Sequence, residues 1–532
     1  MFCRLIALTL AFGCTAEPER PAPLGPLPPP TNVETTRFRD DGACAQCHLV
    51  PDGATVLHDA AGHNVSPVLL WRSSLMALAA RDPYYLAVFD EERTRAPERS
   101  SEIDALCSRC HGPAGSEELA TDGHHLTFEQ LTSGTDAAAT LGRGGVTCTL
   151  CHQIAPGNLG DDRSFSGGFQ VGYQRQLFGR YLNPVTEPMQ LIVNFTPTAG
   201  PQIAESSLCG SCHTVIVPGA SGEVVEQATF LEWRSSKYPA LGRTCQSCHV
   251  PTVDEAGSSI TVLAISRVPA TLGARTPFGR HTFVGGNSYV LRLLSDAPEW
   301  SGAGVSTDEL LASAARDDAH LTEAARLDLV SHDAAGFALR VTNLTGHKLP
   351  TGYPSRRIWL HVRVDAAGDV VFETGGVDAR GAIVDRTGKV LGPQPHRDAI
   401  TAEDEVQIWE AKLVDRDAVV THRALDARGY GKDDRILPEG FAPTGRDRTR
   451  TESRGAELDA TFVPGSDELR FTPPNGLPAG ARIHAELLYE AVAPEIVDAI
   501  ETAATPAGSR FVDLARARPV TPVVMATLDA SY

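Results

Sequence analysis

The pattern of hydrophobic and polar residues changes character near residue 336. Before that point, apolar residues occur in short fragments with helical spacing, separated by glycine and proline, which favours a loop-rich, mainly α-helical region. The clearest predicted helix is Trp71–Phe89, in which apolar residues recur every three to four positions. Shorter helical fragments are predicted at Ser306–Arg316 and Leu321–Leu329.

After residue 336, apolar and polar residues alternate, as expected for strands with one buried face. The alternating segments are Phe337–Val341, Ile358–Val364, Val370–Glu373, Val406–Val414 and Arg482–Tyr489. Several short strands of this kind indicate a β-sandwich-like domain. The predicted fold class is therefore α+β and multidomain, with a mainly α region followed by a β-sandwich.

Five Cys-x-x-Cys-His motifs lie in the first region. Their residues are Cys44, Cys47 and His48; Cys107, Cys110 and His111; Cys148, Cys151 and His152; Cys209, Cys212 and His213; and Cys245, Cys248 and His249. In such a motif two cysteines form thioether bonds to one haem, and the histidine becomes the proximal iron ligand. Zinc is the alternative, but a zinc ribbon needs a second Cys-x-x-Cys about 15–20 residues away. The motifs here are tens of residues apart, so the sequence predicts five haem c groups.

The motifs also suggest an internal duplication. Leu106–His111 and Thr147–His152 begin with Leu-Cys and Thr-Cys, and Leu208–His213 and Thr244–His249 repeat that order. We therefore interpret the second and third motifs as one two-haem unit and the fourth and fifth as its copy, with the first motif added in front. The tetrapeptide Trp-Arg-Ser-Ser occurs at residue 71 and again at residue 233.

The N-terminus resembles a secretory signal peptide. Leu5–Gly13 is apolar but too short to span a membrane, and Ala11–Cys14 resembles a bacterial lipobox in which Cys14 is lipidated. Ala11 replaces the usual leucine, so ordinary signal cleavage is the alternative. Glu17–Pro30 contains seven prolines and predicts an extended spacer. We expect an exported protein of a Gram-negative bacterium, periplasmic or associated with the outer membrane, whose only membrane contact is a lipid anchor.

Composition narrows the set of partners. The formal net charge of −19 argues against nucleic acid, because binding nucleic acid needs a basic face. Redox proteins or an external electron acceptor are the expected partners. Ten of the twelve cysteines belong to the motifs, and the other two are Cys3 and Cys14.

The distal iron ligands must come from outside the motifs, where twelve histidines remain. His281 is favoured because the glycines around it let the backbone approach a flat cofactor. His347 lies on a loop after the first predicted sandwich strand and would link the two regions by reaching back to a haem. The remaining candidates are His124, His125, His58, His63, Met76 and Met189. Methionine ligation would raise the reduction potential of a haem.

Several segments resemble hydroxylamine-oxidoreductase-like multihaem c-type cytochromes, a group that includes the tetrahaem electron carrier of nitrifying bacteria. These segments are Trp71–Tyr85, Glu205–Pro251 and His281–Asn287. Thr342–Val362 and Gly431–Phe441 are similar to the C-terminal β region of exported multihaem cytochromes.

The resemblance implies closely packed haems, mostly with two histidine ligands, and it implies that His281 and His347 are distal ligands. The chain departs from the family at Gln202, where many relatives have histidine. It also has no Cys-x-x-Cys-Lys motif, and it has five motifs rather than the eight usual in the oxidoreductases.

These observations predict a signal peptide over residues 1–13, a proline-rich spacer over 14–42, a pentahaem domain over 43–305, a helical connector over 306–335 and a β-sandwich over 336–532. The leading hypothesis is an electron carrier, with no catalytic residues. One alternative is an oxidoreductase that acts on a small nitrogen or oxygen species at one open haem. Another is a surface-binding protein whose β-sandwich is the working part.

Overall fold

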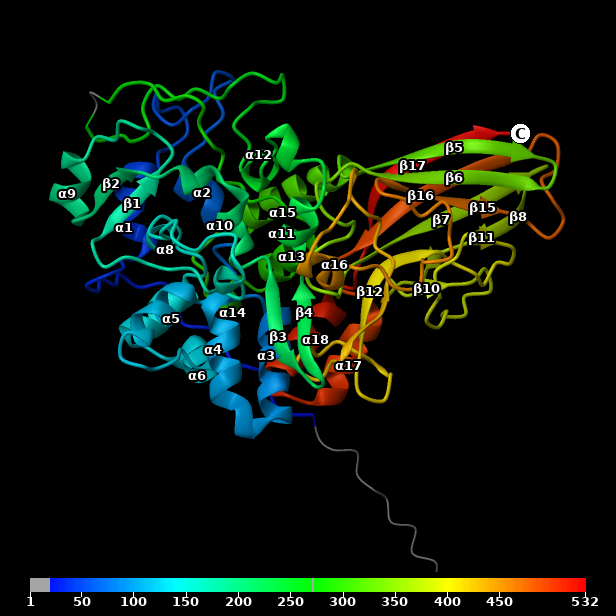
Figure 1. Cartoon of the computed structure of the whole chain (residues 1–532), viewed down its shortest axis with the longest axis horizontal. Coiled ribbons are helices and arrows are strands. Elements are labelled where there is room, and N and C mark those ends of the chain that lie inside the picture. The colour runs from blue at the N-terminus through cyan, green and yellow to red at the C-terminus, as the bar shows by residue number, and fades with distance from the viewer. Residues whose placement is uncertain (1–19, 270–271) are drawn as a thin grey trace, which may run out of the picture.

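A computed structural model describes residues 20–269 and 272–532 (Figure 1). The predicted signal peptide and Cys14 lie outside these residues. Helices and loops form one side of the molecule, and long strands form the other. The α+β fold class predicted from the sequence is confirmed.

The helical side consists of short helices joined by long loops. Its helices are α1 (Asp41–His48), α2 (Pro67–Arg72), α3 (Pro83–Arg95), α4 (Ser100–His111), α5 (Pro113–Ala120), α6 (Phe128–Ser133), α7 (Ala137–Arg143), α8 (Cys148–Cys151), α9 (Glu187–Val193), α10 (Ser206–Gly210), α11 (Thr229–Arg234), α12 (Cys245–His249), α13 (Ser288–Asp296), α14 (Pro298–Ser301) and α15 (Thr307–Thr322). Two small sheets pair β1 (Gln176–Gly179) with β2 (Thr196–Ala199) and β3 (Val215–Gly219) with β4 (Gly222–Gln227).

The single helix predicted over Trp71–Phe89 is wrong, because α2 ends at Arg72 and α3 begins only at Pro83. Asp82 caps α3: its Oδ1 accepts hydrogen bonds from the backbone N–H of Tyr84 at 2.8 Å and of Tyr85 at 3.2 Å. Proline is favoured in a first helical turn and disfavours helix in the residue before it. The helix boundary therefore falls in the middle of a continuous apolar pattern.

The other side is a sandwich of two sheets. The four-stranded sheet has the order β11 (Ala399–Ile400), β15 (Ser466–Phe471), β6 (Gly336–Asn343) and β5 (Ala325–Asp333). The seven-stranded sheet has the order β13 (Val420–Thr421), β12 (Ile408–Val414), β7 (Arg357–Ala366), β16 (Arg482–Glu490) and β17 (Val523–Ser531), with β14 (Gly429–Asp433) beside β12 and β8 (Asp369–Thr374) beside β7. β9 (Gly376–Val377) pairs with β10 (Ile383–Val384) nearby. Phe337 and Leu339 from one sheet pack with Leu360 and Val362 from the other in one core.

All five predicted strand segments lie in or overlap strands of this sandwich. The helical fragment predicted at Ser306–Arg316 is confirmed, and α15 continues to Thr322. The fragment predicted at Leu321–Leu329 is wrong, because β5 begins at Ala325 and pairs antiparallel with β6. Leu327 and Leu329 are two residues apart, which is the period of a strand, and their strand pairs with the edge of β6.

After β16 the chain returns to the helical side as α17 (Pro494–Ala503) and α18 (Pro506–Ala517). Phe511 of α18 contacts Tyr84 of α3, with 5.4 Å between the ring centres. The two sides therefore share one packed boundary.

The proline-rich segment is not a free spacer from residue 20 onward. Leu27 is buried, and its backbone N–H donates to the carbonyl of Trp300 at 2.8 Å. Arg20 forms an ion pair with Asp513 at 2.8 Å. An extended proline-rich segment leaves its backbone groups unpaired, and here several of them pair with the protein body. Within the described residues, no helix is long and apolar enough to cross a membrane.

Candidate haem-binding sites

Four of the five motif histidines are held in an orientation that suits metal binding. In these four the Nδ1 atom lies within hydrogen-bonding distance of a backbone carbonyl oxygen. The pairs are His48 with Ile265 at 2.8 Å, His111 with Ala79 at 2.9 Å, His152 with Phe178 at 2.6 Å and His249 with Val284 at 2.7 Å. An imidazole that donates from Nδ1 leaves the lone pair of Nε2 free for a metal and is fixed in orientation.

Burial keeps these imidazoles neutral, which a metal ligand requires. Desolvation lowers the pKa of His111 and of His213 to about 4. The side chain of His213 is nevertheless exposed.

Two further histidines stand opposite motif histidines. The ring centres of His152 and His281 are 6.4 Å apart, with 24° between the ring planes. His249 and His347 are also 6.4 Å apart, with 16° between their planes. Metal–imidazole bonds are about 2.0 Å long, so two imidazoles on opposite sides of one metal have ring centres roughly 6 Å apart. Burial lowers the pKa of both His281 and His347 to about 4.

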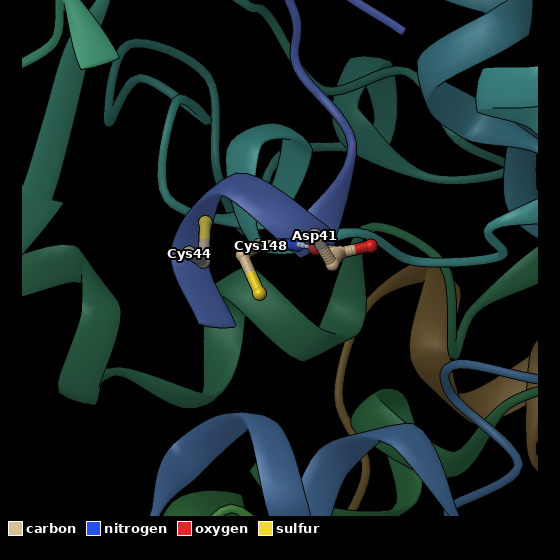
Figure 2. Close-up of side chains that lie close together, drawn as sticks. All are labelled: Asp41, Cys44 and Cys148. Carbon is tan, nitrogen blue, oxygen red and sulfur yellow. Dashed lines mark hydrogen bonds between the residues drawn. The ribbon is translucent and has the colours of Figure 1, made fainter. Parts of the chain in front are cut away.

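Cysteines of different motifs lie side by side. Cys44 and Cys148 form one such pair, and with Asp41 their side-chain ligand atoms lie within 4.8 Å of one another (Figure 2). Cys209 lies beside Cys245, and Cys110 lies beside Cys212, and each neighbour raises the pKa of Cys209 or Cys110. These pairs bring together motifs 1 and 3, motifs 4 and 5, and motifs 2 and 4. Cys151 of motif 3 also lies near Cys212 of motif 4.

These neighbours correct the duplication inferred from the sequence. The backbone N–H of Cys148 donates to Asp41 at 2.8 Å, and that of Cys245 donates to Ser206 at 3.0 Å. Asp41 lies three residues before the first motif, and Ser206 lies three residues before the fourth. The repeated unit is therefore motif 1 with motif 3, copied as motif 4 with motif 5, and motif 2 is the insertion.

The repeated tetrapeptide belongs to this unit. The indole N–H of Trp71 donates to the carbonyl of Val146 at 3.0 Å, and that of Trp233 donates to Arg243 at 2.9 Å. Each carbonyl lies two residues before the first cysteine of a Thr-Cys motif. The Leu-Cys and Thr-Cys sequences suggested a different pairing of the motifs. They could not indicate the correct one, because they carry no information about these long-range contacts.

An ion-pair network holds the loop that carries His347. Glu232 of α11 accepts from the backbone N–H of Lys348 at 3.1 Å and from the Thr351 hydroxyl at 2.6 Å. Its other oxygen is 3.1 Å from the guanidinium of Arg435. Arg435 and Lys348 both contact Asp433, and these cations lower the pKa of Asp433 to about 2 despite its burial. The sandwich is thereby fixed to the helical side next to His249.

Among the described residues, the other histidine candidates do not stand opposite a motif histidine in this way. Met189 lines a cavity together with Cys44, Cys47 and His48, so it lies near the first motif. Met76 packs against the hydrophobic core that contains Trp71 and Leu78. The candidates nearer the surface are His63, which contacts Asp59; His58, whose Nδ1 faces the Val56 carbonyl; and His124 and His125, which are exposed between α5 and α6.

The sequence analysis missed His320. Its ring lies 5.3 Å from that of His249 in an edge-on arrangement, and burial lowers its pKa to about 4. The residue is on α15, beyond the end of the helix predicted there. Continuing that helix by one more turn would have pointed to it.

Comparison with known proteins supports the fold. No protein-family model and no curated relative matches the chain. Among solved structures it is similar to a penta-haem cytochrome c552 from Thermochromatium tepidum, with a TM-score of 0.52 and 18% sequence identity. The match covers 93% of this chain and 99% of that chain. The helical side and the sandwich therefore recur together in one known protein.

Proposed function

We propose that the protein is an exported pentahaem c-type cytochrome that transfers electrons through five covalently bound haems. The observation that carries this proposal is that cysteines of different motifs lie side by side, so that haems attached to them would be close together. The fold shared with a penta-haem cytochrome supports the same conclusion. The haems supply one-electron chemistry, and the protein tunes each potential through axial ligands, burial and nearby charge.

In this proposal the ten motif cysteines hold the haems, and the five motif histidines are proximal ligands. His281 would be the second iron ligand at the third motif, and His347 would be the second ligand at the fifth. The cysteine contacts support a path that runs from motif 1 through 3 and 4 to 5, with motif 2 joining at 4. Backbone carbonyls on Nδ1 would fix the rings of His48, His111, His152 and His249.

We further propose export through a lipoprotein-type signal, with Cys14 as the lipid attachment point and a redox protein or external acceptor as the partner. The hydroxylamine-oxidoreductase-like group remains the family that the motif-bearing segments resemble. Labelling cells with a radioactive fatty acid tests the anchor, since the wild-type protein should incorporate it and Cys14→Ala should not.

The central test is haem content and spin state. The mass of the purified protein should exceed that of its polypeptide by five haem groups, and the reduced protein should show a low-spin c-type spectrum. A redox titration should spread over several potentials. Fewer than five haems, or a redox titration fitted by one potential, would contradict the proposal.

One observation favours catalysis as a second candidate function. In the described residues, no second histidine ring stands about 6 Å from His48, His111 or His213, unlike the other two sites. A haem with one open axial position could bind a small nitrogen or oxygen species. A high-spin signal that nitrite or hydroxylamine shifts, together with turnover lost on removing one motif, would support this function over simple electron transfer.

A further inference from the structure

A second cluster of metal-ligating side chains lies within the sandwich, away from the motifs. It consists of His396 on the loop before β11, Asp459 on the loop before β15, and Asp467 on β15. One ligand atom from each residue lies within 4.8 Å of the other two. The side chains of His396 and Asp459 are only 4% exposed, and Asp467 is fully buried. Water cannot solvate these charges as it would on the surface.

One carboxylate oxygen of Asp467 lacks a hydrogen-bond partner among the described residues. Its Oδ2 accepts the indole N–H of Trp409 at 2.7 Å, while its Oδ1 is buried without a hydrogen-bond partner among the described residues. An unpaired carboxylate oxygen in a protein interior is costly, because it has lost its hydration and gained nothing. A cation bound between Asp467 and its two neighbours would satisfy this oxygen.

His396 is arranged as a metal ligand with a supporting carboxylate. Its Nδ1 lies 3.0 Å from Asp434 Oδ2, and its Nε2 points to Asp459 at 3.1 Å. Asp434 is itself fixed by Gln407 Nε2 at 2.9 Å and by the backbone N–H of Glu410 at 2.9 Å. Metal-bound histidines usually donate their other ring N–H to a carboxylate in this manner. Asp434 would therefore set the ring orientation and leave Nε2 to the metal.

The excess negative charge of the cluster also favours a bound cation. Three aspartates, at 434, 459 and 467, converge on one imidazole, and Lys432 is a cation beside them, with its Nζ 3.3 Å from Asp434. Lys432 also faces Glu410 at 3.5 Å. Buried charges are normally paired or bound to metals. A divalent cation would bring the cluster close to neutrality.

We propose that His396, Asp459 and Asp467 bind a divalent first-row transition-metal ion, of which zinc is the representative, at the junction of the two sheets. Imidazole nitrogen with carboxylate oxygen is a donor set that suits zinc and its neighbours better than magnesium or calcium. Asp467 comes from the four-stranded sheet, and the supporting Asp434 follows β14 in the other. The metal would tie the two sheets together independently of the haems.

The test uses the purified holoprotein, dialysed first against a chelator and then against zinc. Inductively coupled plasma mass spectrometry should find one zinc per chain in the wild type and none in His396→Gln or Asp467→Asn. His361→Gln is the matched control, because its imidazole also lies between two carboxylates, Glu373 at 3.1 Å and Glu486 at 3.3 Å, but is partly exposed. This control should retain its zinc.

Thermal unfolding of the wild-type holoprotein provides a readout that does not depend on the variants folding. Zinc that binds only the folded state raises the unfolding temperature, and the stabilisation grows with the logarithm of the ratio of free zinc to the dissociation constant. Calcium and magnesium at the same concentration should raise it less. Equal or greater stabilisation by calcium would overturn the assignment of metal class.

The competing explanation is a protonated His396 that bridges Asp434 and Asp459 without any metal. In that case the wild type retains no zinc, and Asp467→Asn removes an unpaired buried charge and leaves the protein equally or more stable. Our proposal requires the opposite, namely zinc in the wild type and a lower unfolding temperature for zinc-treated Asp467→Asn than for zinc-treated wild type. Either result decides between the two.

Discussion

The two copies of the motif pair share their scaffold but differ in what surrounds it. In both, a side chain three residues before one motif accepts the backbone N–H of the first cysteine of the other motif. In both, a tryptophan fixes the approach to that cysteine, and a serine hydroxyl donates to the tryptophan carbonyl at 2.7 Å. The contacts that place two adjoining haem motifs are therefore local and were retained when the unit was copied.

What differs is the source of the second histidine. His281 reaches the first copy from the loop after the fifth motif, whereas His347 reaches the second copy from the sandwich. The residue before the repeated tryptophan differs accordingly. It is Leu70 in the first copy and Glu232 in the second, where it anchors the loop that carries His347. The two copies thus differ at this helix position, and the copy with glutamate is the one that contacts the sandwich.

The largest effect is expected from Glu232→Gln, which breaks this attachment. The carboxylate is fully buried, accepts hydrogen bonds from Lys348 and Thr351, and forms an ion pair with Arg435. Removing one partner of a buried ion pair typically costs about 3–5 kcal/mol. We expect the free energy of unfolding to fall by that amount in a denaturant titration of the holoprotein.

Glu223→Gln is the control for that substitution. Glu223 forms an ion pair with Arg450 at 2.9 Å, but its side chain is 53% exposed. Exposed pairs contribute about 0–1 kcal/mol, so this variant should resemble the wild type. Equal losses in both variants would mean that Glu232 does not anchor the sandwich.

Much of this fold could be predicted from the sequence. Alternation of apolar and polar residues located the sandwich strands, because each has one face in a shared core. The helix over Trp71–Phe89 failed because Asp82 and Pro83 start a new helix inside an apolar pattern. The order of the motifs along the chain suggested the wrong duplication, because long-range contacts of Asp41 and Ser206 decide which motifs adjoin.

The next prediction compares the two facing histidines. His281→Ala and His347→Ala should each convert one haem of the five from low-spin to five-coordinate, and added imidazole should restore it. Electron paramagnetic resonance of the oxidised protein measures the loss of low-spin signal. If only one variant changes the spectrum, the two copies are not equivalent at their Thr-Cys motifs.

Ligand placement was only partly predictable. Glycines around His281 and the position of His347 between two regions were usable signals, since both describe what the backbone can reach. His58, His63, His124 and His125 lie near motifs in the sequence, but in the folded chain three of them are exposed. Proximity in sequence says little about which ring faces a motif, because the loops between the motifs are long.

A smaller effect is expected at the repeated tryptophans. Trp71→Phe and Trp233→Phe each remove an indole hydrogen bond to a backbone carbonyl, which typically contributes about 1 kcal/mol to stability. Trp71 is buried whereas Trp233 is partly exposed, so the loss should be larger for Trp71→Phe. Denaturant titrations of the single and double variants measure it, and the losses should add because the two sites share no partner. A loss confined to one variant would contradict the shared scaffold.

The last difference between the copies is a titratable side chain, Asp41, in the first copy. Burial raises the pKa of Asp41 to about 6 from its ordinary 3.8, while Ser206 at the corresponding position carries no charge. Because the folded state holds this proton more tightly, Asp41 stabilises the fold below about pH 4, and the contribution is lost as pH rises through about 6. Asp41→Ser should therefore flatten the dependence of the unfolding free energy on pH in this window. Ser206→Ala should leave that dependence unchanged.

The same carboxyl gives the first copy a pH-dependent potential that the second copy lacks. Above about pH 6, Asp41 is negatively charged beside Cys44 and Cys148, and negative charge favours the ferric state. The potential of an adjoining haem should therefore fall as pH rises through about 6, by no more than about 59 mV per pH unit for a one-electron couple. Redox titrations of the wild type and Asp41→Ser at pH 5 and pH 7 measure this shift. A shift that persists in Asp41→Ser would place the proton on another group and remove the distinction between the two copies.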